Sequence, residues 1–165
     1  MPKLDLDAID CRIIAALQAD GRLSNVELAE RAGLSPSPCL RRVKRLERDG
    51  FISSYRAVLP RNQVGLCMTV FVGVKVDGHA DERCNDVEEA FVAMPEVVAC
   101  HMVSGETADY LLEVVVPDLD TYRQFLNDKL LNLPIIKDVR SSISLQALKA
   151  SAPLPLHHLA AVQCR

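Results

Sequence analysis

Arginine and lysine gather in one short segment of this 165-residue chain, at Arg41, Arg42, Lys44, Arg45 and Arg48. The planar guanidinium group of arginine donates paired hydrogen bonds to phosphate oxygens and to the edge of guanine. The segment therefore suits binding to nucleic acid. Many basic segments are only solvated helix faces, however. The elements that position these residues must decide between the two interpretations.

The charge of the chain is divided unevenly. The whole chain carries a net charge of −3, but residues 1–60 carry +2 and residues 61–165 carry −5. This asymmetry predicts two domains with different partners, of which the first suits a polyanion. With 49% hydrophobic residues, the chain has enough apolar surface to bury in folded cores.

Helical periodicity predicts a first helix that starts after the acidic residues Asp5 and Asp7 and stops near Gly21. A second helix follows Ser24, which stands three residues before Glu27 in the pattern of a capping box. That helix ends at Gly33. The apolar stripes of the two helices are Ile9, Ile13, Ile14 and Leu17, then Val26, Leu28, Ala29 and Ala32.

A third helix is predicted from the cap Ser35 and from Pro36, which suits the first helical position. Two short helices joined by a tight turn with glycine predict a helix-turn-helix, whose second helix enters the major groove of DNA. The basic segment lies on that second helix, which favours DNA contact over a solvated face. Its apolar seam is predicted to be Leu40, Val43 and Leu46, with Gly50 as its end.

Residues 51–59 after that helix are predicted to form a short β segment or wing, with Phe51 and Ile52 in the core. A hinge is expected at Pro60 to Gly65, where Pro, Asn and Gly occur without apolar periodicity. The predicted domains are therefore a helix-turn-helix at 1–59, a linker at 60–66, a second domain at 67–150 and a tail at 151–165.

The second domain alternates strand and helix patterns. Strands are predicted at Met68–Val76, Val97–Val103, Tyr110–Val116 and Val139–Leu148. Helices are predicted at Asp81–Met94 and after the cap Asp118, with Leu119, Tyr122, Phe125, Leu126 and Leu130 on the latter. The order β-α-β-β-α-β is that of a ferredoxin-like fold, so the chain is an α+β protein. Strands that are apolar on both faces predict burial against a second copy, hence a homodimer.

Several fragments, taken together and in this order, resemble the Lrp/AsnC (feast/famine) family of regulators. In the first half they include Leu6–Asp10, Asp20–Arg22, Ser24–Ala29, Gly33–Val43 and Leu46–Ile52. In the second half they include Pro95–Val97, Cys100–Gly105, Asp109–Leu112 and Leu133–Pro134. The resemblance covers nearly the whole chain.

This resemblance implies an amino-acid-responsive, sequence-specific transcriptional regulator that dimerises through its second domain, assembles toward an octamer and acts on genes of amino-acid metabolism or transport. On the third helix, the residues expected to contact operator DNA are Ser35, Ser37, Pro38, Arg41, Arg42, Lys44 and Arg45. In the loop after the second strand of the second domain, those expected at the effector site are Ser104, Gly105, Glu106, Thr107, Ala108, Asp109 and Tyr110.

The chemistry of that loop suits an amino acid, because a glycine turn offers backbone N–H groups to a carboxylate and acidic side chains accept an ammonium group. The loop is longer than the family pattern between Gly105 and Tyr110, so Asp109 is a better candidate than Glu106. The alternative for Asp109 is a loop cap or an ion pair across the dimer.

Other classes lack support in the sequence. No nucleophile or acid–base group, no GxGxxG motif and no phosphate-binding loop indicates an enzyme or a nucleotide cofactor. The six cysteines contain no CxxC pair, so we expect neither a metal nor a disulfide framework. No apolar run is long enough for a membrane helix, and we expect a cytoplasmic, nucleoid-associated protein. Two alternatives stay open: a sensor that has lost DNA binding, and a DNA-compacting protein with little sequence preference.

Overall fold

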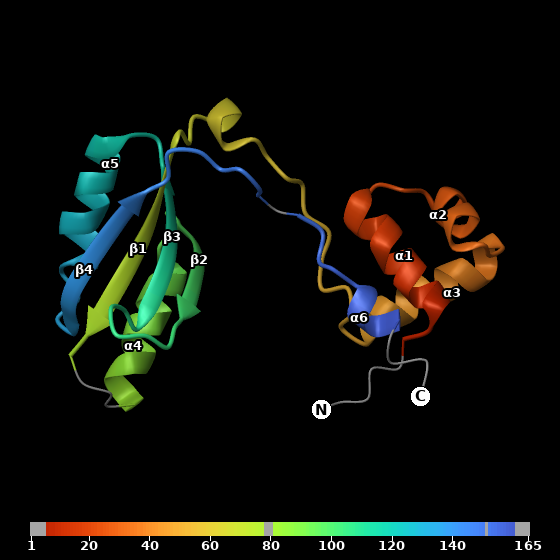
Figure 1. Cartoon of the computed structure of the whole chain (residues 1–165), viewed down its shortest axis with the longest axis horizontal. Coiled ribbons are helices and arrows are strands. Elements are labelled where there is room, and N and C mark those ends of the chain that lie inside the picture. Colours follow the sequence, from red (N-terminus) through yellow and green to blue (C-terminus); the bar gives the residue numbers. More distant parts are fainter. Residues whose placement is uncertain (1–5, 78–80, 151, 161–165) are drawn as a thin grey trace. The chain divides into compact units, whose positions relative to one another are not determined.

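The computed structural model describes residues 6–77, 81–150 and 152–160, with the side chains of residues 81–84, 157 and 160 excepted. The chain divides into two compact units (Figure 1). The first comprises Met1–Val58 together with Lys149–Arg165, and the second comprises Leu59–Leu148.

The first unit contains the three predicted helices, α1 (Ala8–Ala19), α2 (Asn25–Ala32) and α3 (Pro36–Arg48). Asp7 caps α1 and exchanges hydrogen bonds with Asp10 in a capping box, and α1 ends at Asp20. The expected acidic start at Asp7 is therefore confirmed, whereas Asp5 lies outside the described residues. Capping of this kind satisfies backbone N–H groups that have no partner within the helix.

The turn between α2 and α3 follows the prediction closely. Ser24 and Glu27 form the capping box of α2, and Gly33 ends α2 with a positive φ of 73° that glycine adopts without strain. Pro36 occupies the start of α3 as predicted. Ser35 has the extended backbone of a cap, but its side chain accepts no capping hydrogen bond.

The three helices pack around one apolar cluster. It contains Leu6, Ile13, Leu28, Ala29, Ala32, Cys39, Leu46 and Leu159. On α3 the buried seam is Cys39, Val43 and Leu46, because these positions share one helix face. Leu40 does not belong to it: its side chain is 43% exposed, which corrects the predicted seam.

Residues 51–59 form no strand, contrary to the expected β segment or wing. Phe51 is also partly exposed rather than in the core, while Ile52 packs against the cluster. A strand requires a neighbour to accept its backbone hydrogen bonds, and no described segment of the first unit lies beside this one as a strand. The segment therefore runs extended without a ladder.

The C-terminal segment belongs to the first unit rather than standing apart as a tail. Its described part includes a short helix, α6 (His157–Ala160), whose Leu159 is buried in the apolar cluster. Gln18 of α1 also exchanges two hydrogen bonds with the backbone of Leu154. The described part of this segment thus packs on α1.

The hinge predicted at 60–66 is mostly a short 3₁₀ helix, η1 (Arg61–Val64), which ends at Gly65. Arg61 donates hydrogen bonds to Thr69 and to Glu113, both on sheet strands. Because of these bonds, η1 is attached to the second unit.

The second unit confirms the ferredoxin-like order. Its elements are β1 (Met68–Val76), α4 (Asp81–Ala93), β2 (Val97–Met102), β3 (Tyr110–Val116), α5 (Leu119–Gln124) and β4 (Ile136–Ile143). A π-helical stretch at Phe125–Leu130 continues α5. The sheet order is β2-β3-β1-β4, and each pair is antiparallel. Both helices pack on one face of this sheet, where Val70, Val72 and Val74 meet Phe91 and Tyr122 (Figure 1).

The opposite face of the sheet is more polar than predicted. Phe71 and Leu111 are its exposed large apolar residues on β1 and β3, but Lys75 and Glu113 lie on the same face. Alternation along a strand explains this placement, since Phe71 and Lys75 stand at odd positions between the buried valines.

The last strand spans Ile136–Ile143 rather than the predicted Val139–Leu148. Its partner β1 begins at Met68, and the final backbone bond of the pair joins Ser144 N–H to the Thr69 carbonyl. Leu145 and Leu148 therefore lie beyond the sheet and are exposed. None of the helices in the described ranges has the length and apolar character needed to cross a membrane.

Candidate nucleic-acid interface and ligand loop

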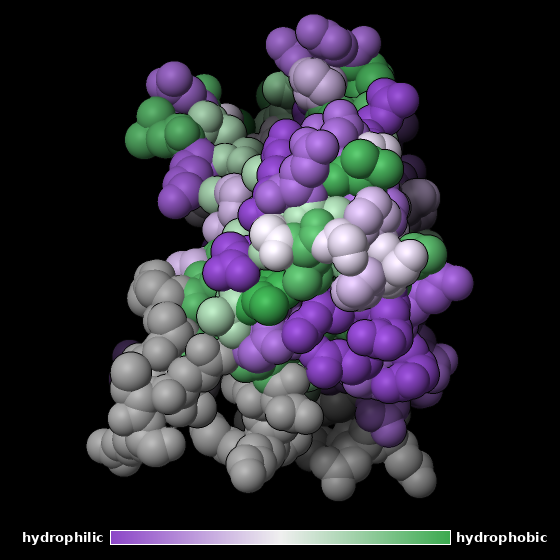
Figure 2. All heavy atoms as spheres, turned by 90° about the vertical axis from the view of Figure 1, so that its right-hand side faces the viewer, coloured by the Kyte–Doolittle hydropathy of each residue, from purple (hydrophilic) through white to green (hydrophobic). Residues whose placement is uncertain are grey.

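Five residues of α3 point away from the apolar cluster and form what we call its outer face: Ser37, Leu40, Arg41, Lys44 and Arg48. All five are exposed, and their spacing places them on one side of the helix. They line an open hollow of about 680 Å³ together with Arg42 and Arg45. On the side of the molecule where α2 and α3 lie, hydrophilic side chains surround a smaller apolar area (Figure 2).

Arg42 and Arg45 are held differently from the outer face. Arg42 Nη1 donates to Asp7 Oδ2 at 2.6 Å and to Asp10 Oδ1 at 2.9 Å. Arg45 Nη2 donates to Asp10 Oδ2, and the backbone N–H of Asp7 donates to the same oxygen at 3.1 Å. We call these four residues the acid–arginine cluster. It joins the start of α1 to the middle of α3.

The two outer members of this cluster are firmly charged. Burial acts to raise the pKa of Asp7, but the hydrogen bonds from the Asp10 amide and from Arg42 outweigh it and hold the pKa below its ordinary value. Hydrogen bonds to Asp10 and Asp7 raise the pKa of Arg42. Both groups are therefore ionised at neutral pH.

The remaining residues predicted to contact DNA lie at the start of α3. Ser35 and Ser37 are exposed, and Pro38 is half-buried. Asn25 fixes this end of the helix, because its side-chain amide donates to the Pro36 carbonyl at 2.9 Å. Sequence reasoning missed Asn25, which follows the cap of α2 and carries no distinguishing pattern.

Two further arginines act within the first unit. Arg12 of α1 donates two hydrogen bonds to the Ala32 carbonyl at the end of α2, where a helix leaves carbonyl groups without partners. Arg48 pairs with its neighbour Asp49 at 2.8 Å. Neither contact was expected from the sequence.

The predicted effector loop connects β2 to β3. Ser104, Gly105, Glu106 and Thr107 are exposed. Asp109 is half-buried, and its carboxylate accepts from Lys75 Nζ at 2.9 Å and from the Val76 backbone N–H at 3.0 Å. The structure thus brings an opposite charge from β1 to Asp109 within the same chain, a pairing that the sequence did not reveal.

The loop approaches β1 closely at Gly73. A Cβ atom at this glycine would lie 3.3 Å from the Cβ of Ala108, tighter than ordinary van der Waals contact. Tyr110 turns the other way: its ring is buried against Phe91, and its hydroxyl donates to Glu88 at 2.8 Å. Of the predicted loop residues, Ala108 and Asp109 therefore face β1 and Tyr110 enters the core.

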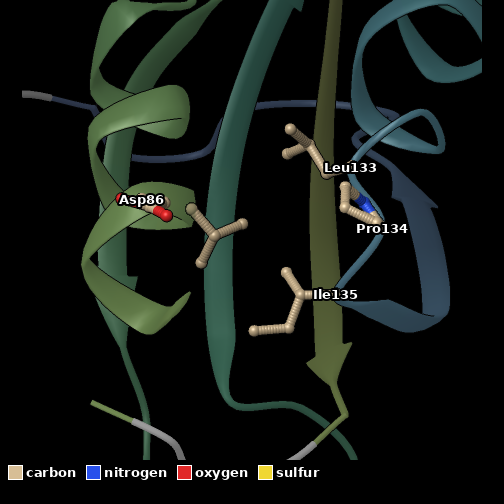
Figure 3. Close-up of a pocket in the computed structure, with 5 residues that line it drawn as sticks. Asp86, Leu133, Pro134 and Ile135 are labelled. Atoms are coloured by element: carbon tan, nitrogen blue, oxygen red, sulfur yellow. The ribbon is translucent and has the colours of Figure 1, made fainter. Parts of the chain in front are cut away.

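A separate hollow of about 160 Å³ lies between α4 and the segment before β4. Asp86 lies on one side of it, and the side chains of Leu133, Pro134 and Ile135 lie on the other (Figure 3). The described residues that line it offer one carboxylate and no cationic group, so they provide no partner for the carboxylate of an amino acid. Its volume is also below that of typical ligand sites.

Four of the six cysteines have described side chains. Cys11, Cys39, Cys67 and Cys100 are free thiols, and burial raises the pKa of Cys11, Cys39 and Cys100. A protonated thiol is a poor nucleophile and a poor metal ligand. Within the described ranges no three His, Cys, Asp or Glu residues form a metal site. The side chain of Cys84, and Cys164 and His157, lie outside the description.

Both units match models of known protein families. Residues 6–53 match the family model for a winged helix-turn-helix DNA-binding domain, and residues 69–154 match that of the Lrp/AsnC ligand binding domain. The leucine-responsive regulatory proteins of Escherichia coli K12 and Klebsiella pneumoniae are each 44% identical over 150 residues, 91% of either chain.

Solved structures agree with this assignment. A transcriptional regulator from Neisseria meningitidis in complex with L-Met is 41% identical, with a TM-score of 0.89 over 93% of this chain and 99% of that one. An AsnC family regulator from Agrobacterium tumefaciens is 36% identical, with a TM-score of 0.88 over the same shares. The chain therefore belongs to the Lrp/AsnC family, whose members are DNA-binding transcriptional regulators with an amino-acid-binding domain and not enzymes.

Proposed function

We propose that this regulator contacts operator DNA through α3, with Arg41 and Lys44 as its principal phosphate contacts. The observation that carries the proposal is the outer face of α3. Within the described chain neither Arg41 nor Lys44 forms an ion pair, so both charges remain available to a polyanion. Cations with no internal partner release counterions from DNA when they bind phosphates.

The start of α3 adds further contacts in this proposal. Ser35, Ser37 and Pro38 lie where the N-terminal residues of a recognition helix approach base edges. Arg42 and Arg45 stand beside the outer face and line the same hollow, so they reach DNA from within the acid–arginine cluster. Contacts to phosphate fix the orientation, and contacts to bases supply specificity.

The second part of the proposal is an amino-acid effector bound at the loop 104–109. The Lys75–Asp109 pair offers a cation for the carboxylate of an amino acid and an anion for its ammonium group. Exposed Ser104, Gly105, Glu106 and Thr107 border the pair along the chain, while buried Tyr110 supports the loop from the core. The solved complex of a relative with L-Met makes methionine the first ligand to test.

The open face of the sheet supports homodimerisation. Phe71 and Leu111 place exposed apolar surface between charged residues, which is the composition of a specific interface with a polar rim. We propose that dimers formed through this face assemble further to an octamer. Phe71→Glu in the full chain should then lower the molar mass measured by light scattering, whereas unchanged mass would count against this interface.

The genes under control are proposed to serve amino-acid metabolism or transport, because a regulator that binds an amino acid is useful where that amino acid is made or moved. The protein would then act at the nucleoid in the cytoplasm. No cofactor other than the amino acid is included in this proposal.

An electrophoretic shift on DNA upstream of the protein's own gene tests the central step. The expected result is a shift that survives an excess of unrelated duplex and changes with one of the twenty amino acids. A sensor that had lost DNA binding would give no shift, and a DNA-compacting protein would bind both duplexes alike. Either result would contradict the proposal.

A further inference from the structure

The acid–arginine cluster contains a buried charge that the proposed DNA contacts do not explain. The side chain of Asp10 is 1% exposed, although it lies at the first turn of a helix near the protein surface. A carboxylate in such a place is stable only when its oxygens are fully paired. Here Arg42, Arg45 and the Asp7 backbone N–H supply that pairing.

These bonds orient the two arginines but leave some of their N–H donors unused. Their side chains remain 27% and 35% exposed and line the hollow beside the outer face of α3. Within the described chain Arg42 uses Nη1 and Arg45 uses Nη2 for the cluster. Since a guanidinium carries five N–H donors, others remain for phosphate or base oxygens.

We propose that Asp10 is a positioning residue for DNA binding, which holds Arg42 and Arg45 in the orientation that contacts the operator. The inference rests on the proposed role of α3. A long arginine side chain loses rotamer freedom when it binds, and an arginine already fixed by Asp10 loses less. Asp10 itself stays buried and touches no DNA.

The proposal makes a prediction of opposite sign to simple electrostatics. Asp10 is an acid close to a surface that binds a polyanion, so removing its charge should strengthen DNA binding if charge alone matters. If Asp10 positions the two arginines, removing its charge should weaken binding. Weakening should be larger on the operator than on unrelated duplex, because fixed arginines serve specificity.

The test measures fluorescence anisotropy with the full-length Asp10→Asn variant on operator and on unrelated duplex. We expect the operator dissociation constant to rise about tenfold and that of the unrelated duplex to change little. Asp49→Asn is the matched control, because Asp49 is an exposed acid that pairs with Arg48 at the end of α3. This control should bind both duplexes as well as the wild type or more tightly.

Tighter binding of Asp10→Asn to both duplexes would overturn the proposal and leave the cluster as a structural ion pair. Should thermal unfolding show that Asp10→Asn does not fold, Asp7→Asn decides, because asparagine keeps the helix cap while the carboxylate charge that pairs with Arg42 is removed. Weaker operator binding supports positioning, and binding as tight as that of Asp49→Asn contradicts it. The proposed DNA-binding role of α3 is tested separately. If that role were wrong, the double variant Arg41→Ala with Lys44→Ala would bind DNA with wild-type affinity.

Discussion

The outer face of α3 and the loop at 104–109 present charge in opposite ways. On α3, Arg41 and Lys44 are exposed cations that form no ion pair within the described chain. At the loop, Asp109 and Lys75 are already paired with each other and partly buried. DNA supplies the negative charges that the cations of α3 lack. An amino acid at the loop must instead replace interactions within an ion pair that is already satisfied when no ligand is bound.

This contrast predicts that α3 is the more sensitive to loss of charge. The double variant Arg41→Ala with Lys44→Ala should weaken binding to operator and unrelated duplex alike and flatten the salt slope by about two units, because two phosphate contacts disappear. Anisotropy titrations at several salt concentrations measure both. Lys137→Ala, an exposed cation on β4, is the control and should change neither. An unchanged slope in the double variant would remove α3 from the interface.

At the loop, loss of one charge should affect the ligand and not the DNA. Asp109→Asn should lower amino-acid affinity by about 2–5 kcal/mol, since the ammonium group and Lys75 both lose their partner. Calorimetry measures this, and DNA binding without effector should be unaffected. Glu106→Gln should have a smaller effect, because Glu106 is exposed. Equal ligand affinity in wild type and Asp109→Asn would make the Lys75–Asp109 pair purely structural.

The first unit also depends on the C-terminal segment, which emerges after β4. Leu159→Ala should lower the free energy of unfolding of that unit by about 2 kcal/mol, because Leu159 is 7% exposed within its core. Leu154→Ala is the matched control: its side chain is 72% exposed, so the change should stay within about 0.5 kcal/mol. Chemical denaturation separates the two. Similar stability of both variants would show that the segment does not contribute to the core.

The smallest effect concerns Tyr55, whose hydroxyl donates to Glu47. Burial, and then the hydrogen bond to Glu47, raise the pKa of Tyr55 from 10.0 to about 12. The folded state favours the neutral phenol, so this stabilisation is present below pH 10 and is lost as the pH rises toward 12. It should stay below about 1 kcal/mol, because Tyr55 is half exposed.

Absorbance titration of the phenolate tests this pKa directly. Wild type should contain a tyrosine that ionises near pH 12, and Tyr55→Phe should lack it. Glu47→Gln should move its titration to lower pH, since the neighbouring negative charge is removed. An unaltered titration curve in Glu47→Gln would show that the carboxylate does not influence Tyr55.

Local signals in the sequence predicted most of the fold. The capping box of Ser24 and Glu27, the glycine at 33 and the proline at 36 each act over a few residues, and the structure confirms all three. The predictions were wrong where the secondary structure of a segment depends on a neighbouring strand. Residues 51–59 have strand-like composition but no neighbouring strand among the described residues, and β4 ends where its antiparallel partner β1 begins.

The candidate sites were less predictable for the same reason. The basic segment identified α3, but the pairing of Arg42 with Asp10 spans 32 residues and depends on how α1 crosses α3. Likewise Asp109 was recognised as a candidate ligand residue, whereas Lys75, which is 34 residues away in the sequence, became visible only through the register of β1 with β3.

In the function proposed above, α3 binds the operator and an amino acid at the loop changes that binding. Operator anisotropy with and without each of the twenty amino acids, starting with L-Met, tests it most directly, because an effector and DNA that are linked must alter each other's affinity. We expect a changed operator dissociation constant with at least one amino acid, a change retained in Glu106→Gln and lost in Asp109→Asn. Operator binding that none of the twenty alters, or a response that persists in Asp109→Asn, would contradict it.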